Sequence, residues 1–172
     1  MTFEELKQIL WQAIDKLYKK DSYLFEGKVS ERAISHKLAC YITELVPKKK
    51  KNSGWHVDAE YNRNVEAPKT LTFDDKDTCV VPDILIHRRG LNNDGDIKDN
   101  NLLVIEIKKN AKRSGQEKDI DKIKAFVNDY PYCYKYGLFI NFKTRVKTTT
   151  HLSYWFCRDS ENLDCEELEN GI

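Results

Sequence analysis

A chain of 172 residues has the size of one ordinary domain and is too short for two domains that each bury a substantial core. With 40% hydrophobic and 33% charged residues, its composition excludes a disordered or membrane-embedded protein and is typical of a globular one. No stretch is apolar enough to span a bilayer, and the N-terminus lacks the basic start and apolar run of a secretory signal, so we expect a cytoplasmic protein without membrane contact.

The formal net charge of +1 hides an uneven distribution along the chain. Residues 159–172 contain six acidic residues and no basic one, which leaves 29 basic against 22 acidic residues, a net charge of +7, on residues 1–158. A basic body is compatible with a polyanionic partner, although many proteins that bind no nucleic acid share this feature. We expect one domain over 1–172, with an N-terminal helix and connection at 2–29 and an acidic tail at 159–172 as a candidate mobile segment.

Two amphipathic helices are predicted first. Thr2 and Glu5 form a capping-box pattern, which predicts a helix from Thr2 to Tyr18. Ser30 is a candidate N-cap for a second helix that ends before Pro47. A basic loop follows at Lys48–Lys51.

The hydrophobic period then changes to two, which predicts strands. Trp55, Val57, Ala59 and Tyr61 alternate with polar residues and should face one side of the first strand. Two more strands are predicted over residues 79–87 and 102–108, joined by a turn-rich loop that contains Asn92, Asn93, Asp94 and Gly95.

A third helix and two further strands complete the pattern. Helical spacing predicts a helix over 116–129, and the apolar run 136–142 can return from it as a crossover strand. Residues 149–157 supply a last strand. This order indicates a mixed α/β domain with a central sheet.

Two short segments place charged side chains inside these apolar strands. Pro82-Asp83 lies in the second predicted strand, and Glu106-Ile107-Lys108 ends the third. Strand alternation puts Glu106 and Lys108 on one face, where a buried carboxylate and ammonium are costly unless each finds a partner, a metal or a function. If the strands pair, Asp83 and Glu106 converge as oxygen ligands of a hard cation such as Mg²⁺, and the Ile107 carbonyl is a further candidate ligand.

Such a site suits phosphodiester hydrolysis. A bound Mg²⁺ polarises a phosphoryl oxygen and lowers the pKa of a coordinated water. Lys108 would act as the catalytic base or neutralise the developing charge. The candidate catalytic residues are therefore Asp83, Glu106 and Lys108, and the candidate metal ligands are Asp83, Glu106 and the carbonyl of Ile107.

Pro82-Asp83, a loop and Glu106-Ile107-Lys108 also resemble the signature of the PD-(D/E)XK nuclease superfamily, and the likeness extends to the order of elements over residues 30–142. The resemblance implies a small stand-alone member with a restriction endonuclease-like, three-layer α/β fold, in which helices flank a central mixed sheet. It further implies that Asp83 and Glu106 bind Mg²⁺, for which Mn²⁺ can substitute, and that a Glu of the preceding helix joins the site. Glu31 matches that Glu.

We expect cleavage of nucleic acid, DNA rather than RNA, and a homodimer is one form that could cut both strands. Glu60, on the polar face of the first strand, is a second accessory candidate. Candidate contacts to nucleic acid are Lys122, Gln116, Arg88, Arg89 and the loop Lys48–Lys51.

Three plainer interpretations stay open. Asp83 and Lys108 could form a simple cross-strand ion pair, and lysines such as Lys122 are often just solvated on a helix surface. The motif is short, since Glu5-Leu6-Lys7 also matches its second half within a predicted helix. The domain could also bind nucleic acid without catalysis or serve protein contacts.

Overall fold

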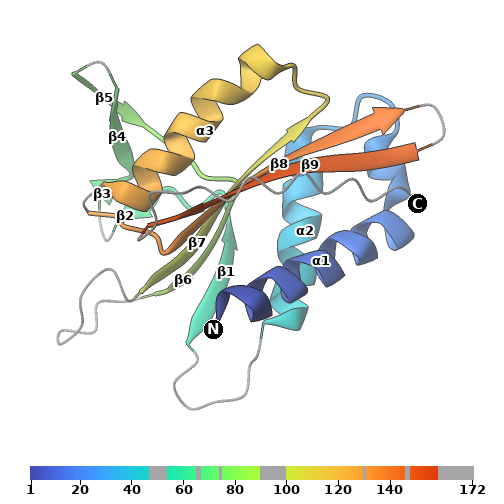
Figure 1. The fold of residues 1–172 in the computed structure, drawn as a ribbon, viewed down its shortest axis with the longest axis horizontal. Coiled ribbons are helices and arrows are strands. Elements are labelled where there is room, and N and C mark those ends of the chain that lie inside the picture. The colour runs from blue at the N-terminus through green and yellow to red at the C-terminus, as the bar shows by residue number, and fades with distance from the viewer. Residues whose placement is uncertain are drawn as a thin grey trace.

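A five-stranded mixed sheet forms the centre of the molecule (Figure 1). The computed structural model describes residues 1–46, 54–64, 67–73, 75–89, 100–129, 131–145 and 148–158. The basic loop Lys48–Lys51, the turn at Asn92–Gly95 and the acidic tail 159–172 lie outside the described residues. The strand order in the sheet is β1-β6-β7-β8-β9, and only β7 and β8 run parallel among these neighbours.

The sheet strands agree with four of the predicted segments. Their bounds are β1 Trp55–Ala59, β6 Ile84–Arg88, β7 Asn101–Lys109, β8 Tyr136–Arg145 and β9 Thr148–Cys157. The predicted crossover is confirmed, because α3 (Arg113–Asn128) connects the parallel strands β7 and β8. Long apolar runs such as that of β7 are expected for strands that are covered on both faces.

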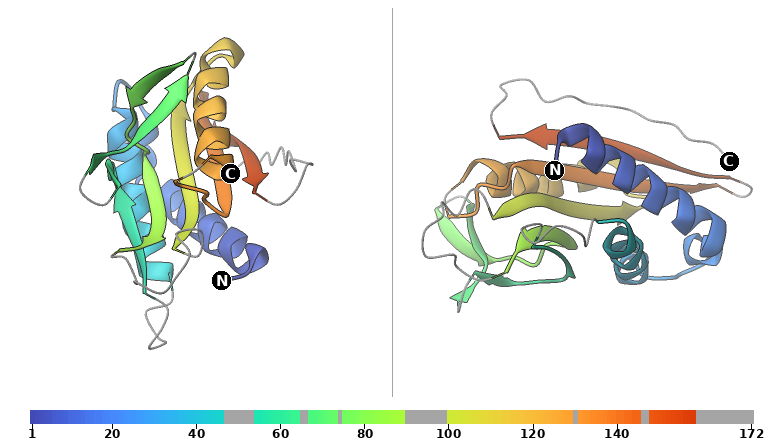
Figure 2. Two further views of the ribbon diagram at one scale, coloured as in Figure 1. Left: turned by 90° about the vertical axis from the view of Figure 1, so that its left-hand side faces the viewer. Right: turned by 90° about the horizontal axis from the view of Figure 1, so that it is seen from below.

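Helices cover both faces of the sheet (Figure 2). Helices α1 (Phe3–Lys20) and α2 (Glu31–Leu45), joined through the short helix η1 (Ser22–Phe25), pack with Leu103, Ile105 and Ile107 of β7 in one apolar cluster. Helix α3 packs on the opposite face with Val104. From Leu103 to Ile107, odd and even residues of β7 therefore face different helical layers, as its alternation predicts. No helix in the described part of the chain is long and apolar enough to cross a membrane.

The predicted starts of the first two helices are confirmed, whereas α3 begins three residues before the predicted start at Gln116. The Thr2 hydroxyl accepts a hydrogen bond from the Glu5 N–H, and the Glu5 carboxylate accepts one from the Thr2 N–H, which completes the capping box. Glu5-Leu6-Lys7 is thus part of a helix, so its match to the nuclease signature is accidental. Helix α2 begins after Ser30, although the Ser30 side chain makes no capping hydrogen bond.

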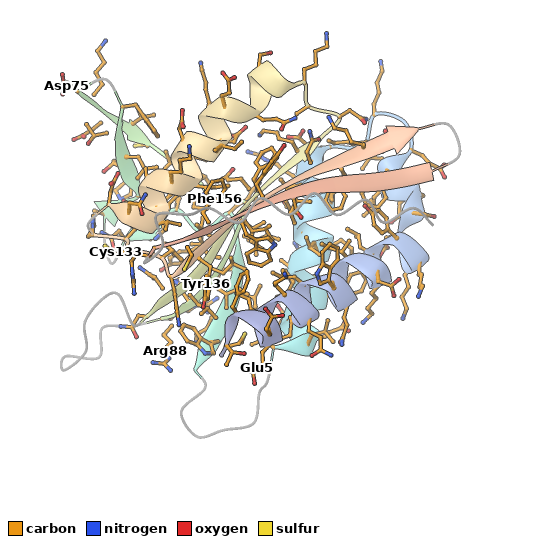
Figure 3. All side chains as sticks on the ribbon, viewed as in Figure 1. Glu5, Asp75, Arg88, Cys133, Tyr136 and Phe156 are labelled. Carbon is orange, nitrogen blue, oxygen red and sulfur yellow. The ribbon has the colours of Figure 1, made fainter. Side chains whose placement is uncertain are left out.

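The strand predicted over residues 79–87 is wrong in its first half. Cys79 ends β5 (Lys76–Cys79), which pairs with β4 (Thr70–Phe73) in a separate hairpin, and β6 begins only at Ile84. The hairpin turns at Asp75, which has a positive φ of 60° and lies at its tip (Figure 3). Pro82 lacks the N–H that a central strand would need for its ladder, which favours a break between the two strands.

The first strand also ends earlier than predicted. Glu60 adopts a positive φ of 52°, which breaks the alternation after Ala59. Tyr61 therefore packs in the apolar cluster of α3, whereas Trp55, Val57 and Ala59 pack against that of α1 and α2. A further small hairpin, β2 (Arg63–Asn64) with β3 (Ala67–Pro68), follows and was not predicted.

Candidate active site

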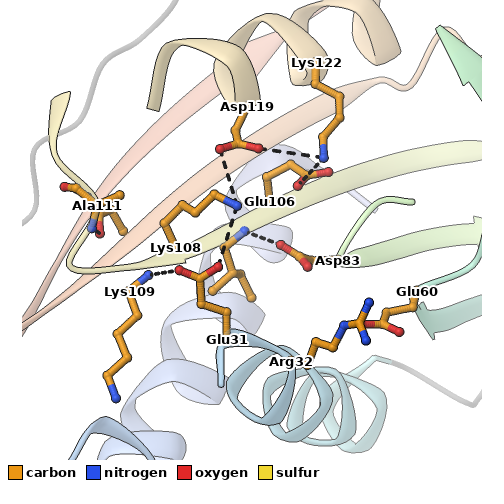
Figure 4. A network of polar contacts seen from close by, with 12 residues as sticks. Glu31, Arg32, Glu60, Asp83, Glu106, Lys108, Lys109, Ala111, Asp119 and Lys122 are labelled. Carbon is orange, nitrogen blue, oxygen red and sulfur yellow. Dashed lines mark hydrogen bonds and ion pairs between the residues drawn. The ribbon is translucent and has the colours of Figure 1, made fainter. Parts of the chain in front are cut away.

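The pairing of β6 with β7 brings Asp83 and Glu106 together. Ile84 lies opposite Ile105 in this antiparallel pair. Asp83 precedes Ile84 and Glu106 follows Ile105, so the two acidic residues come opposite each other where β6 begins. Figure 4 shows both carboxylates beside the same stretch of β7.

Glu106 is a buried carboxylate that is only half satisfied. The residue is 2% exposed, and its Oε2 pairs with the ammonium of Lys122 at 2.8 Å. Its Oε1 is buried and has no hydrogen-bond partner among the residues that the structure describes. The pKa of Glu106 is raised to about 8, chiefly by burial, with a smaller contribution from the nearby Asp83 carboxylate and an opposing effect of Lys122. A second cation beside Oε1 would relieve this cost.

Asp83 is fixed by the backbone of the strand that it faces. Its Oδ2 accepts a hydrogen bond of 2.7 Å from the N–H of Ile107. Burial raises the pKa of Asp83, although this hydrogen bond lowers it in part. The N–H and carbonyl of one strand residue point to the same side, so the Ile107 carbonyl also faces the side of Asp83, beyond the end of β6.

Lys108 lies between two carboxylates from different helices. Its Nζ is 3.4 Å from Asp119 Oδ2 on α3 and 3.7 Å from Glu31 Oε2 on α2. Burial alone would lower the pKa of Lys108, but the surrounding carboxylates, chiefly Asp119 and Glu31, outweigh it and hold the pKa above its ordinary value. Lys108 is therefore an ammonium at neutral pH, suited to stabilising negative charge rather than to taking a proton. The alternative ion pair with Asp83 is not formed among the described residues.

Glu31 joins the network from the first turn of α2. Its Oε1 accepts a hydrogen bond of 2.8 Å from the N–H of Lys109, at the end of β7. The other oxygen faces Lys108. Glu31 thus ties the start of α2 to the strand that carries Glu106 and Lys108.

Glu60 lies next to the site, but its carboxylate turns away from it. The Glu60 N–H donates to the carbonyl of Asp83 at 3.1 Å, while the side chain pairs with Arg32 at 2.8 Å (Figure 4). Its backbone therefore positions Asp83, and its side chain remains a separate, exposed ion pair.

The candidate contacts to nucleic acid lie in different places. Lys122 is inside the network, paired with Glu106. Gln116 is buried, and its amide donates to the carbonyl of Ala111 at 3.1 Å. Both of these residues belong to α3, on the face of the sheet that carries Glu106.

The two arginines lie at the far end of β6. Arg88 lies over the ring of Trp55, and Arg89 pairs with Asp58, which also accepts a hydrogen bond from His87. Asp83 is five residues away along the strand, or roughly 16 Å at strand spacing. These arginines are therefore not part of the group around Glu106.

Asp119 is the site residue that the sequence interpretation missed. It faces Lys108 through Oδ2 and Lys122 through Oδ1, the latter at 3.8 Å. The available signal was its spacing on α3, since Asp119 lies one turn after Gln116 and one turn before Ile123, both of which are buried. A helix position between buried neighbours predicts a side chain that faces the sheet.

The oxygen donors of this site are of the kind that a hard divalent cation takes. Within the described residues, no three His, Cys, Asp or Glu side chains are grouped closely enough to hold a metal ion. The oxygen donors that a cation could use here are the carboxylates of Asp83 and Glu106 and the carbonyl of Ile107. Mg²⁺ commonly takes one or two carboxylates and keeps several waters, so the set fits such an ion.

Comparison with known proteins gives no family assignment: no family model matches the chain, and no curated protein sequence matches it.

Proposed function

We propose that the protein is a Mg²⁺-dependent nuclease that hydrolyses phosphodiester bonds, in DNA rather than RNA, and that it has a restriction endonuclease-like fold of the PD-(D/E)XK type. The observation that carries the proposal is the buried Oε1 of Glu106, which has no partner in the described part of the chain, on a residue directly opposite Asp83. A structural ion-pair network would be expected to satisfy that oxygen, since an uncompensated buried carboxylate costs stability. A binding site for a cation accounts for it.

Each side chain of the site has a role that fits this chemistry. Asp83, Glu106 and the Ile107 carbonyl would hold the ion, which supplies a Lewis acid for the phosphoryl oxygen and makes water more acidic. Lys108, kept protonated by Asp119 and Glu31, would stabilise the negative charge that develops on the phosphate. Glu31 and the backbone of Glu60 would hold β7 and Asp83 in position.

The test is a cleavage assay with matched variants. Plasmid, branched and single-stranded DNA and RNA are incubated with the full chain in Mg²⁺ or Mn²⁺, beside Asp83→Asn, Lys108→Met and the control Glu117→Gln, whose residue is exposed on α3. We expect Asp83→Asn and Lys108→Met to lower the cleavage rate at least about a hundredfold, the usual effect of removing one group that stabilises a transition state. Glu117→Gln should leave it unchanged.

Equal cleavage by all four proteins would rule out this site. Salt-dependent binding without metal-dependent cleavage would instead favour a binding module of the same fold. If the chain binds no nucleic acid and calorimetry detects no heat of Mg²⁺ binding, a protein-interaction domain would be favoured.

A further inference from the structure

Lys122 forms an ion pair with Oε2 of the Glu106 carboxylate. Its Nζ lies 2.8 Å from Glu106 Oε2, and its side chain is 19% exposed (Figure 4). An ammonium in this position supplies part of the positive charge that a buried carboxylate requires. Lys122 is thus a counter-ion held by the group that the proposed function assigns to the metal.

Asp119 offers Lys122 a second carboxylate on the same helix. Asp119 Oδ1 is 3.8 Å from Lys122 Nζ, one turn back along α3, while its Oδ2 faces Lys108. The Lys122 ammonium can therefore leave Glu106 without becoming unpaired, because a lysine side chain has four rotatable bonds and its second partner is already close.

A divalent cation and an ammonium repel each other at the few ångströms that separate the two oxygens of one carboxylate. Binding of the ion at Glu106 should consequently weaken the bond to Lys122. We propose that Lys122 is a displaceable counter-ion: it leaves Glu106 when a divalent cation binds there, and the released ammonium then contacts a phosphate of the nucleic acid. This inference rests on the proposed function, and it links metal binding to substrate binding through one side chain.

The first test measures the reactivity of Lys122 towards a water-soluble acetylating reagent in the full chain. Such reagents react with accessible amines, so greater exposure of the Lys122 amine speeds the reaction. Peptide mass spectrometry measures the rate of acetylation at Lys122. The Lys122 side chain is only 19% exposed while it pairs with Glu106, so we expect acetylation to be about fivefold faster with saturating Mg²⁺ than without Mg²⁺. Lys118, an exposed lysine of the same helix, should react at the same rate with and without Mg²⁺.

Two further arms make the outcome decisive. In Glu106→Gln, Lys122 should react fast in the presence or absence of Mg²⁺. Calorimetry of the wild-type chain, run at the same Mg²⁺ concentrations, reports whether the ion binds. Binding of Mg²⁺ with no change at Lys122 would overturn this inference and leave the proposed function intact, whereas no binding of Mg²⁺ would overturn both.

The phosphate contact has its own measurement. Ca²⁺ replaces Mg²⁺ to prevent cleavage, and the affinity for a fluorescent DNA duplex is measured against salt concentration for wild type, Lys122→Met and Lys118→Met. One lost phosphate contact lowers the slope of log affinity against log salt by about 0.9. We expect Lys122→Met to show this loss in Ca²⁺ and to match wild type without it. A slope equal to wild type under both conditions would overturn the phosphate contact.

Discussion

Glu106 is a carboxylate whose charged form the fold holds at a cost. Its pKa in the folded protein is raised by burial to about 8, above the ordinary value of 4.5. A group with a raised pKa contributes stability that is fully present below its unfolded pKa and is lost as the pH rises through its folded pKa. The free energy of unfolding should therefore fall between about pH 4.5 and pH 8 on account of this residue.

Glu106→Gln keeps the shape of the side chain and removes its charge. In a buffer with a chelator, we expect the variant to match wild type near pH 5 and to be more stable by roughly 1–3 kcal/mol near pH 8, because Lys122 retains Asp119 as a partner. Urea unfolding at both pH values measures the difference, and Glu117→Gln is the exposed control. A variant less stable than wild type at pH 8 would contradict the prediction.

Only part of this site could be predicted from the sequence. Asp83, Glu106 and Lys108 stand out because a charged residue inside an apolar strand needs a reason, and strand alternation sets their faces. Asp119 does not stand out, because an acidic residue on an amphipathic helix is ordinary until the docking of that helix is known. The pairing of Lys122 with Glu106 likewise depends on how α3 lies across β7.

At the scale of elements, helices and strands with a clear period were predicted well, and the connection before Asp83 was not. Helical spacing is continuous in α1, α2 and α3, and β7 is apolar from Leu102 to Ile107 except at Glu106. Residues 79–87 also look like one strand, yet Cys79 pairs in a hairpin and Ile84 starts the sheet strand. Propensity alone could not separate them, because pairing partners decide where a strand belongs.

The docking of α3 requires a glycine on β8. A Cβ on Gly137 would lie 2.3 Å from Ile123 Cγ2 and 2.9 Å from Val127 Cγ2, two side chains that are buried in the core. Since α3 carries Asp119 and Lys122, this close approach also sets their height above β7.

Gly137→Ala should therefore destabilise the protein by about 1–3 kcal/mol, the usual cost of overpacking a core. Gly115→Ala is the matched control, because a Cβ there meets nothing within 4 Å and Gly115 lies inside α3. Replacing glycine by alanine in a helix should stabilise it by roughly 0.5–1 kcal/mol. Urea midpoints of the two variants that shift in the same direction would contradict this account of how α3 docks.

For the whole molecule, charge is divided between a basic body and an acidic C-terminal segment. Residues 1–158 carry a net charge of +7, against −6 on residues 159–172. If the basic body binds nucleic acid, the acidic segment competes with the phosphates for it, and the strength of this competition depends on screening by salt.

Removal of residues 159–172 should increase the affinity for DNA at low salt, and the gain should shrink as salt rises, because the Debye length falls from roughly 30 Å at 0.01 M to about 3 Å at 1 M. The comparison uses the Asp83→Asn background, so that DNA stays intact, and fluorescence anisotropy at several salt concentrations. A second variant keeps residues 159–172 but has their six acidic residues changed to Asn or Gln. It separates the effect of the negative charge from the effect of removing the segment. If charge is the cause, this neutralised chain binds like the shortened one; if it binds like the unmodified chain, electrostatic competition is not how the segment acts.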